Sequence, residues 1–218
     1  MTRIACLYVP LFPLAARLRS EPDLLHEAVA IVDGSGANAH VVAATKRART
    51  KGIKAGQSLA QARSIIPKLI ARGRDTECER TAQEALLEVA ETFSPRIEDA
   101  GEGLAYFDVS GMERHFDDER ALASAALRAA DAVGLPARIG IAASKLAARV
   151  AAELPKSPTI VDPGRESEFL APLPLARLTP ELDAAATLRR WGLTSIGELA
   201  RLPESEVASR LGELGREL

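Results

Sequence analysis

Aromatic residues and cysteines are scarce in this chain. Only 4% of the 218 residues are aromatic, so the core has to be built from Ala, Leu, Val and Ile. The two cysteines, Cys6 and Cys78, lie far apart with no CxxC or Cys/His spacing, and the three histidines are scattered. Such spacing gives a zinc site little support. Reduced thiols, as in the cytosol, are the expected state of both cysteines.

Long apolar runs and a basic excess are also missing. No run reaches the ~18 residues of a membrane span. The N-terminal apolar run is broken at Pro10 and Pro13, which is unlike a signal peptide. The formal net charge is -2, so nucleic-acid binding has to come from a local patch rather than from the global charge. We therefore expect a cytoplasmic protein with no membrane partner.

A β-hairpin with its turn at Glu102-Gly103 stands at the centre of the predicted fold. Glycine accepts the positive φ that two-residue hairpin turns need. After the turn, alternate residues face opposite sides of the strand, with Ala105, Phe107 and Val109 on one side and Leu104, Tyr106 and Asp108 on the other. This alternation predicts one face packed on helices and one open face, which would be the working face.

Hydrophobic periodicity predicts an α+β order of elements. The expected strands are 4–9, 28–33, 40–44, 69–72, 138–142 and 159–161, besides the hairpin, and the expected helices are 11–18, 46–51, 58–66, 75–93, 117–133 and 144–153. Thr45 and Ser58 are the predicted N-caps of the second and third helices. The first strand, together with the elements from the helix of 75–93 to the strand of 138–142, predicts a palm-like βαββαβ sheet. We expect helices to cover one face of this sheet.

From about residue 165 the sequence pattern changes, and it predicts short helices separated by prolines. Helices are expected at 183–191, 195–202 and 204–211, with Thr194 as the cap of the middle one. The sequence stops within this helical module, which suggests a fragment of a longer protein.

Several segments, in order, resemble motifs of the Y-family DNA polymerases of the DinB/UmuC type. They are VVAATKRARTKGIKAGQSLAQAR at 41–63, YFDVS at 106–110, RIGIAASKLAARVAA at 138–152, FLAPLPLARL at 169–178 and LRRWGLTSIGELA at 188–200. The resemblance implies a palm at 1–12 and 75–164 and a small fingers insertion at 13–74. It also implies a truncated all-helical thumb with helix-hairpin-helix character at 165–218, without the little finger and C-terminal tail.

The carboxylates of a polymerase centre are missing from the matching positions. Polymerase chemistry uses two Mg²⁺ ions about 3.5–4 Å apart, and hard oxygen ligands have to hold them. The first strand carries no Asp or Glu between Cys6 and Phe12. The positions of the lost carboxylates are Leu7, Gly103 and Leu104. We therefore expect an inactive polymerase centre with no metal and no cofactor.

A polymerase-like body without metal ligands resembles the ImuB group. That resemblance implies a non-catalytic adaptor in DNA-damage-induced (SOS) mutagenesis and translesion synthesis. The implied partners are a sliding clamp, a RecA-like accessory protein and an error-prone polymerase, reached mostly through a region beyond the thumb. The protein would bind the DNA primer-template weakly and associate with the nucleoid.

Two groups of cations are candidates for binding DNA phosphates. They are Lys46, Arg49, Lys51 and Lys54 in the fingers motif and Lys145 and Arg149 on the helix of 144–153. The alternative interpretation of both groups is a solvated helix face. In the thumb, Thr179-Pro180-Glu181 replaces a Gly-x-Gly hairpin, and this replacement makes DNA binding at that point doubtful, because proline has no amide hydrogen.

Two other functions stay open. One is an active Y-family polymerase with atypical ligands, such as Glu98, Asp99, Glu102 or Asp108, which would need Mg²⁺. The other is a pure protein-interaction module without DNA affinity, in keeping with the near-neutral charge.

Overall fold

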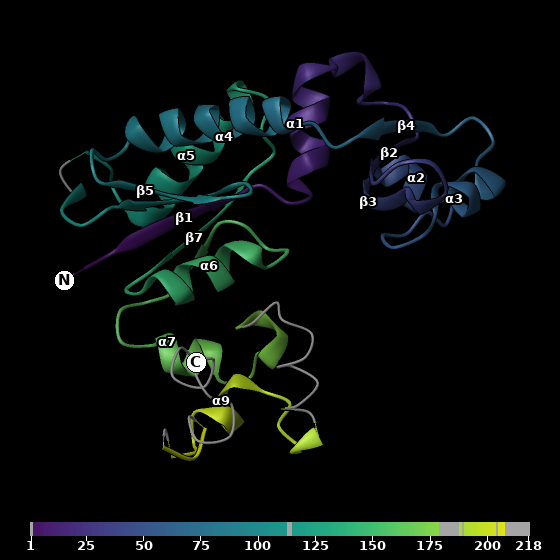
Figure 1. Ribbon diagram of the computed structural model, residues 1–218. Coiled ribbons are helices and arrows are strands. Elements are labelled where there is room, and N and C mark those ends of the chain that lie inside the picture. Colours follow the sequence, from purple (N-terminus) through teal and green to yellow (C-terminus); the bar gives the residue numbers. More distant parts are fainter. Residues whose placement is uncertain (1, 113–114, 179–187, 189, 204, 208–218) are drawn as a thin grey trace.

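The computed structural model describes residues 2–112, 115–178, 188, 190–203 and 205–207 (Figure 1). Its elements form a five-stranded sheet, a separate three-stranded sheet and a small helical part near the C-terminus. No helix in these ranges is long and apolar enough to cross a membrane.

The larger sheet has the strand order β5-β6-β1-β7-β8. Its central strand, β1, pairs antiparallel with both β6 and β7, whereas β8 runs parallel to β7. The strands and their connecting helices are β1 (Ile4–Tyr8), α4 (Thr76–Glu91), β5 (Ile97–Gly101), β6 (Leu104–Asp108), α5 (Glu119–Ala132), β7 (Arg138–Ala142) and β8 (Thr159–Ile160). This is the predicted palm-like βαββαβ order, and the α+β class is confirmed.

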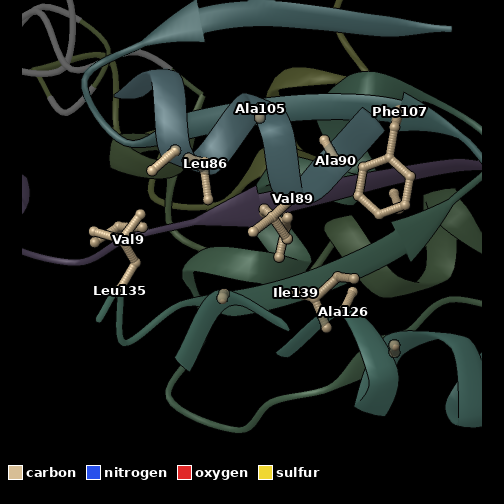
Figure 2. Close-up of a cluster of buried hydrophobic side chains, with 14 of the residues drawn as sticks. Val9, Leu86, Val89, Ala90, Ala105, Phe107, Ala126, Leu135 and Ile139 are labelled. Carbon is tan, nitrogen blue, oxygen red and sulfur yellow. The ribbon is translucent and has the colours of Figure 1, made fainter. Parts of the chain in front are cut away.

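Helices α4 and α5 cover one face of this sheet (Figure 1). Between them and the strands lies the main core, where Leu86 and Val89 of α4 meet Phe107 of β6 and Ile139 of β7 (Figure 2). Phe107 is the largest side chain of this core that is fully buried, and most of its neighbours are Ala, Leu, Val and Ile. The prediction of an aliphatic core is therefore confirmed.

The second face of the sheet is not left open, which corrects the prediction of helices on one face only. Helix α6 (Lys145–Glu153) lies on this face and packs on β1 and β7. A Cβ at Gly140 would stand 2.2 Å from the carbonyl oxygen of Ala148, so the close approach of α6 requires glycine there. Over β5 and β6, a shallow pocket on this face is lined by Ile4, Tyr106 and Lys145, among other residues.

The smaller sheet has the order β3-β2-β4, with β2 and β3 as the predicted hairpin and β4 parallel to β2. Helix α1 packs on one face of this sheet, and α2 and α3 pack on the other. The elements are α1 (Phe12–Ser20), η1 (Pro22–Leu24), β2 (Val29–Asp33), η2 (Gly36–Asn38), β3 (His40–Ala44), α2 (Lys46–Arg49), α3 (Leu59–Ile65) and β4 (Ile70–Gly73). The domain boundaries at residues 12, 74 and 164 stay predictions.

The cap of α2 differs from the prediction. Thr45 stands at the N-cap position without a capping hydrogen bond, because its buried hydroxyl donates to the carbonyl of Glu27 and accepts the N–H of Val29. Ser58 does cap α3, in a capping box with Gln61.

The C-terminal part contains α7 (Glu166–Leu170), η4 (Leu175–Arg177) and α9 (Ile196–Leu199). Leu175, Ile196 and Leu199 form its small core, and Trp191 packs against it. The helix predicted at 195–202 is shorter than expected, and its cap is Ser195 rather than Thr194. The predicted helices at 183–191 and 204–211 fall largely outside the described residues.

Candidate functional site

The structure brings the backbones of the three positions without carboxylates together. Tyr8 pairs with Leu104 and Leu7 pairs with Ala105 across β1 and β6. Immediately beyond the strand, the N–H of Val9 donates to the carbonyl oxygen of Gly103 at 2.8 Å. The side chains diverge, because Leu7 belongs to the core under α4 and α5 whereas Leu104 packs on the face that α6 covers.

Apolar packing fills two of the three predicted positions of lost ligands, Leu7 and Gly103. Leu7 is fully buried. A Cβ at Gly103 would lie 2.7 Å from Cδ2 of Phe12, and this glycine has φ +82°. Real Cβ atoms essentially never make so short a contact, so Phe12 would have to move to admit any side chain there. The residues present therefore do not fit a pair of Mg²⁺ ions, which need oxygen ligands.

A buried glutamine holds the hairpin turn at this point. Gln83 of α4 accepts the N–H of Gly103 at 2.9 Å and donates to the carbonyl of Leu104 at 2.9 Å and to Asp99 at 2.7 Å. The predicted turn at Glu102-Gly103 is confirmed, with positive φ at both residues. Sequence reasoning missed Gln83, although its place one turn before Leu86 on the buried stripe of α4 could have marked it.

The other carboxylates of the hairpin point in different directions. Glu98 forms an ion pair with Lys145 of α6. Asp99, the next residue, bonds to Gln83 on the side of α4. Neighbouring strand residues face opposite sides of a sheet, so Glu98 and Asp99 do not converge on one ion.

Asp108 lies near the far end of β6 and pairs with Arg96 at 2.9 Å. Hydrogen bonds from Ser110 are the main reason why the pKa of Asp108 is lowered, and the Arg96 charge adds to this effect. Within the described ranges, no group of three or more His, Cys, Asp and Glu residues is placed to hold a metal ion.

The fingers cations are exposed. Lys46 and Arg49 lie on α2, and Lys51 and Lys54 lie in the loop that follows it. No hydrogen bond or ion pair joins any of these four side chains to another residue of the described chain. They are therefore available to an anionic ligand.

The two cations of α6 have partners within the protein. Lys145 pairs with Glu98 and lies 6.0 Å from the ring centre of Tyr106. One Nη of Arg149 donates to the carbonyl of Arg177 at 3.4 Å and to that of Leu178 at 3.3 Å. The structure thus separates the six candidate cations into a free group and an engaged group. Thr179-Pro180-Glu181 lies outside the described residues.

The fold is that of a Y-family DNA polymerase. DinB from Sulfolobus solfataricus superimposes with a TM-score of 0.79 at 20% identity, covering 98% of this chain and 64% of that one. An insertion ternary complex of Dbh DNA polymerase gives a TM-score of 0.82 at 19% identity, with the same coverage.

Residues 7–153 match the IMS (impB/mucB/samB) family, and the chain belongs to that family. It is 36% identical over 197 residues to DNA polymerase IV of Dehalococcoides mccartyi, which covers 88% of this chain and 50% of that protein. It is 31% identical over 161 residues to protein ImuB of Caulobacter vibrioides, which covers 74% of this chain and 35% of that protein. The chain thus spans half or less of these relatives. The predicted family is confirmed.

Proposed function

We propose that this chain is the polymerase-like part of a catalytically inactive adaptor in DNA-damage-induced mutagenesis and translesion synthesis. The observation that carries the proposal is the closure of the metal-ligand positions by apolar packing. Leu7 is buried in the core, and Phe12 occupies the space that a side chain at Gly103 would need. Two-metal phosphoryl transfer requires carboxylates at this point.

DNA binding in this proposal is weak and uses the phosphate backbone. The exposed cations Lys46, Arg49, Lys51 and Lys54 support it, because phosphate contacts from Lys and Arg need no particular base sequence. Lys145 and Arg149 remain candidates, but each would have to leave a partner within the protein.

The partners are proposed from the resemblance to the ImuB group. A sliding clamp, a RecA-like accessory protein and an error-prone polymerase would assemble on the full protein, chiefly through its region beyond the thumb. Cytoplasmic, nucleoid-associated action follows from that role.

Primer extension by the full-length protein tests the inactivity. We expect no extension with Mg²⁺ or Mn²⁺ while circular dichroism shows a folded protein. Extension that is lost in Glu102→Gln or Asp108→Asn, and kept in the exposed-carboxylate control Glu91→Gln, would show an active centre rebuilt on the hairpin and overturn the proposal.

A binding titration on the same primer-template tests the DNA half. The double variant Lys46→Gln/Arg49→Gln should bind more weakly, with a shallower dependence on salt. Absence of binding even at low salt would instead support the pure protein-interaction module.

A further inference from the structure

The segment from 34 to 74 contains no acidic residue. It lies between Asp33 and Asp75 and carries nine Lys and Arg residues, although acids outnumber bases in the whole chain, 30 to 28. The segment runs from the end of β2 through β3, α2, α3 and β4. Positive charge is therefore concentrated on the fingers in a chain that is slightly acidic as a whole.

Most of these cations are unengaged. Arg47 donates to the carbonyl of His26, and Arg72 and Arg74 form ion pairs with Glu21 and Glu79. The other six side chains are exposed and have no hydrogen bond or ion pair with the described residues; they are Lys46, Arg49, Lys51, Lys54, Arg63 and Lys68. Internal neutralisation thus leaves six charges open to a ligand.

The elements that carry these six cations lie together on one face of the smaller sheet. Buried Ala48 of α2 and Ala62 of α3 pack in the same core against the sheet, so both helices lie on the same sheet face. Their exposed surfaces, with the loop between them, carry five of the six cations, and Lys68 follows α3. Figure 1 shows this unit beside the larger sheet, beyond α1.

The composition of the segment indicates which ligand it would bind. Residues 34–74 include no Phe, Tyr or Trp, and His40 is the single histidine among them, so the segment offers little of the aromatic surface on which single-strand binding proteins stack unpaired bases. Ile65 is the one large apolar side chain exposed in the segment. Protein interfaces depend on buried aromatic and apolar anchors, which makes a phosphate backbone the better match than an acidic protein.

We propose that residues 34–74 form a self-contained site for the backbone of duplex DNA. The proposal rests on the DNA-binding half of the proposed function and assigns it to the fingers alone. Duplex DNA should bind more tightly than single-stranded DNA, because its negative charge density is higher. Single strands would need base stacking on aromatic side chains to make up this difference, and the segment has no Phe, Tyr or Trp for it. We expect primer ends to add no affinity, because Glu98 and Asp108 of the hairpin are paired with Lys145 and Arg96, and no group of three or more His, Cys, Asp and Glu within the described residues is placed to hold a metal ion.

The test compares two variants of equal charge change by fluorescence anisotropy. The fingers variant is Lys54→Gln/Arg63→Gln/Lys68→Gln. The control is Arg120→Gln/Arg128→Gln/Lys156→Gln, whose three cations are also exposed but lie outside the fingers. The probes are a 20-bp blunt duplex, a primer-template and a 20-nucleotide single strand, each titrated at several salt concentrations with the full-length protein. Thermal unfolding confirms that both variants are folded.

We expect the fingers variant to bind the blunt duplex about tenfold more weakly or worse, with the salt slope lower by about 0.9 for each lost contact. The control should stay within about twofold. Equal loss in both variants would overturn the proposal, as would tighter binding of the primer-template than of the blunt duplex. Binding of a poly-glutamate peptide without binding of DNA would point to an acidic protein partner instead. Primer extension is read separately, so failure of the inactive-adaptor proposal is distinguishable from failure of this one.

Discussion

Gln83 and Gly103 are joined by a hydrogen bond in which the N–H of Gly103 donates to the Gln83 side-chain oxygen at 2.9 Å. The side-chain nitrogen of Gln83 donates to the carbonyl of Leu104 and to the carboxylate of Asp99. A neutral side chain from α4 thus organises the turn that resembles the metal-bearing hairpin of a polymerase. The three hydrogen bonds of Gln83 hold the hairpin turn in place.

Replacing Gln83 should destabilise the fold. Gln83→Ala leaves the N–H of Gly103 and the carbonyl of Leu104 without their partner in a buried place, which costs about 2–3 kcal/mol. Urea unfolding measures the loss, and Glu88→Ala, at an exposed position of the same helix, serves as the control. Equal urea midpoints for the two variants would show that water can hydrogen-bond the N–H of Gly103 and the carbonyl of Leu104 when Gln83 is absent.

A second prediction concerns the space at Gly103. Gly101 and Gly103 both have positive φ, 70° and 82°, but a Cβ at Gly101 meets nothing within 4 Å. Alanine at either position pays the left-handed conformational cost of about 1–2 kcal/mol. Only Gly103→Ala also collides with Phe12, which adds about 1–3 kcal/mol of overpacking.

Chemical denaturation of the two alanine variants separates these effects. A larger loss for Gly103→Ala is the expected result. The same loss for both variants would mean that Phe12 moves aside at little cost, and that the position could admit a side chain after all.

The sequence was sufficient for features that depend on local patterns. The turn at Glu102-Gly103 follows from glycine and the flanking alternation, and the βαββαβ order follows from helical and strand periodicities. That Leu7 stands at the position of a lost ligand stays a prediction from the motif.

Features that depend on distant contacts could not be predicted in this way. Small residues such as Ala148 and Ala152 mark a buried helix face, but they do not reveal that α6 sits on the second sheet face, at Gly140. Thr45 has the composition of a cap, yet its hydroxyl is taken by Glu27 and Val29, far along the chain. Whether a cation is free or paired can be judged only in the folded structure. Lys145, for example, pairs with Glu98, which lies far from it in the sequence.

The partly buried ion pair of Arg3 and Glu119 supplies a third prediction. The Arg3 guanidinium donates twice to Glu119, at 2.6 Å each, and once to the carbonyl of Val161 at 3.0 Å. These bonds join the residue before β1 to the start of α5 and to the residue after β8. Glu119→Gln leaves Arg3, which is 6% exposed, without its counter-charge. We expect a loss of about 1.5–3 kcal/mol in urea unfolding, the range for hydrogen bonds to charged groups. Glu119 is 34% exposed, so the loss should fall short of that for a fully buried pair.

The exposed pair of Arg80 and Glu77 is the matched control, with side chains 57% and 71% exposed. Glu77→Gln should leave the urea midpoint unchanged, because exposed ion pairs contribute little. Comparable losses in Glu119→Gln and Glu77→Gln would contradict the structural role of the Arg3 pair.

The last prediction is a pH dependence in the C-terminal part. The backbone N–H groups of Thr194 and Ser195 donate to Glu198, and they are the main reason why its pKa falls from 4.5 to about 2. A carboxyl with a depressed folded-state pKa stabilises the fold above its unfolded pKa, and the stabilisation is lost as the pH falls toward the folded value. The relevant window is therefore pH 4.5 to about 2.

Trp191, the single tryptophan, packs on the core beside α9 and can report on this region. We expect the stability difference between the native protein and Glu198→Gln, followed by tryptophan fluorescence in urea, to be greatest above pH 4.5 and to shrink steadily below it. The variant keeps the shape of the capping box but removes the titrating group, so it should lack that part of the pH dependence. A difference that stays constant across the window would mean that the charge on Glu198 is not what holds the start of α9.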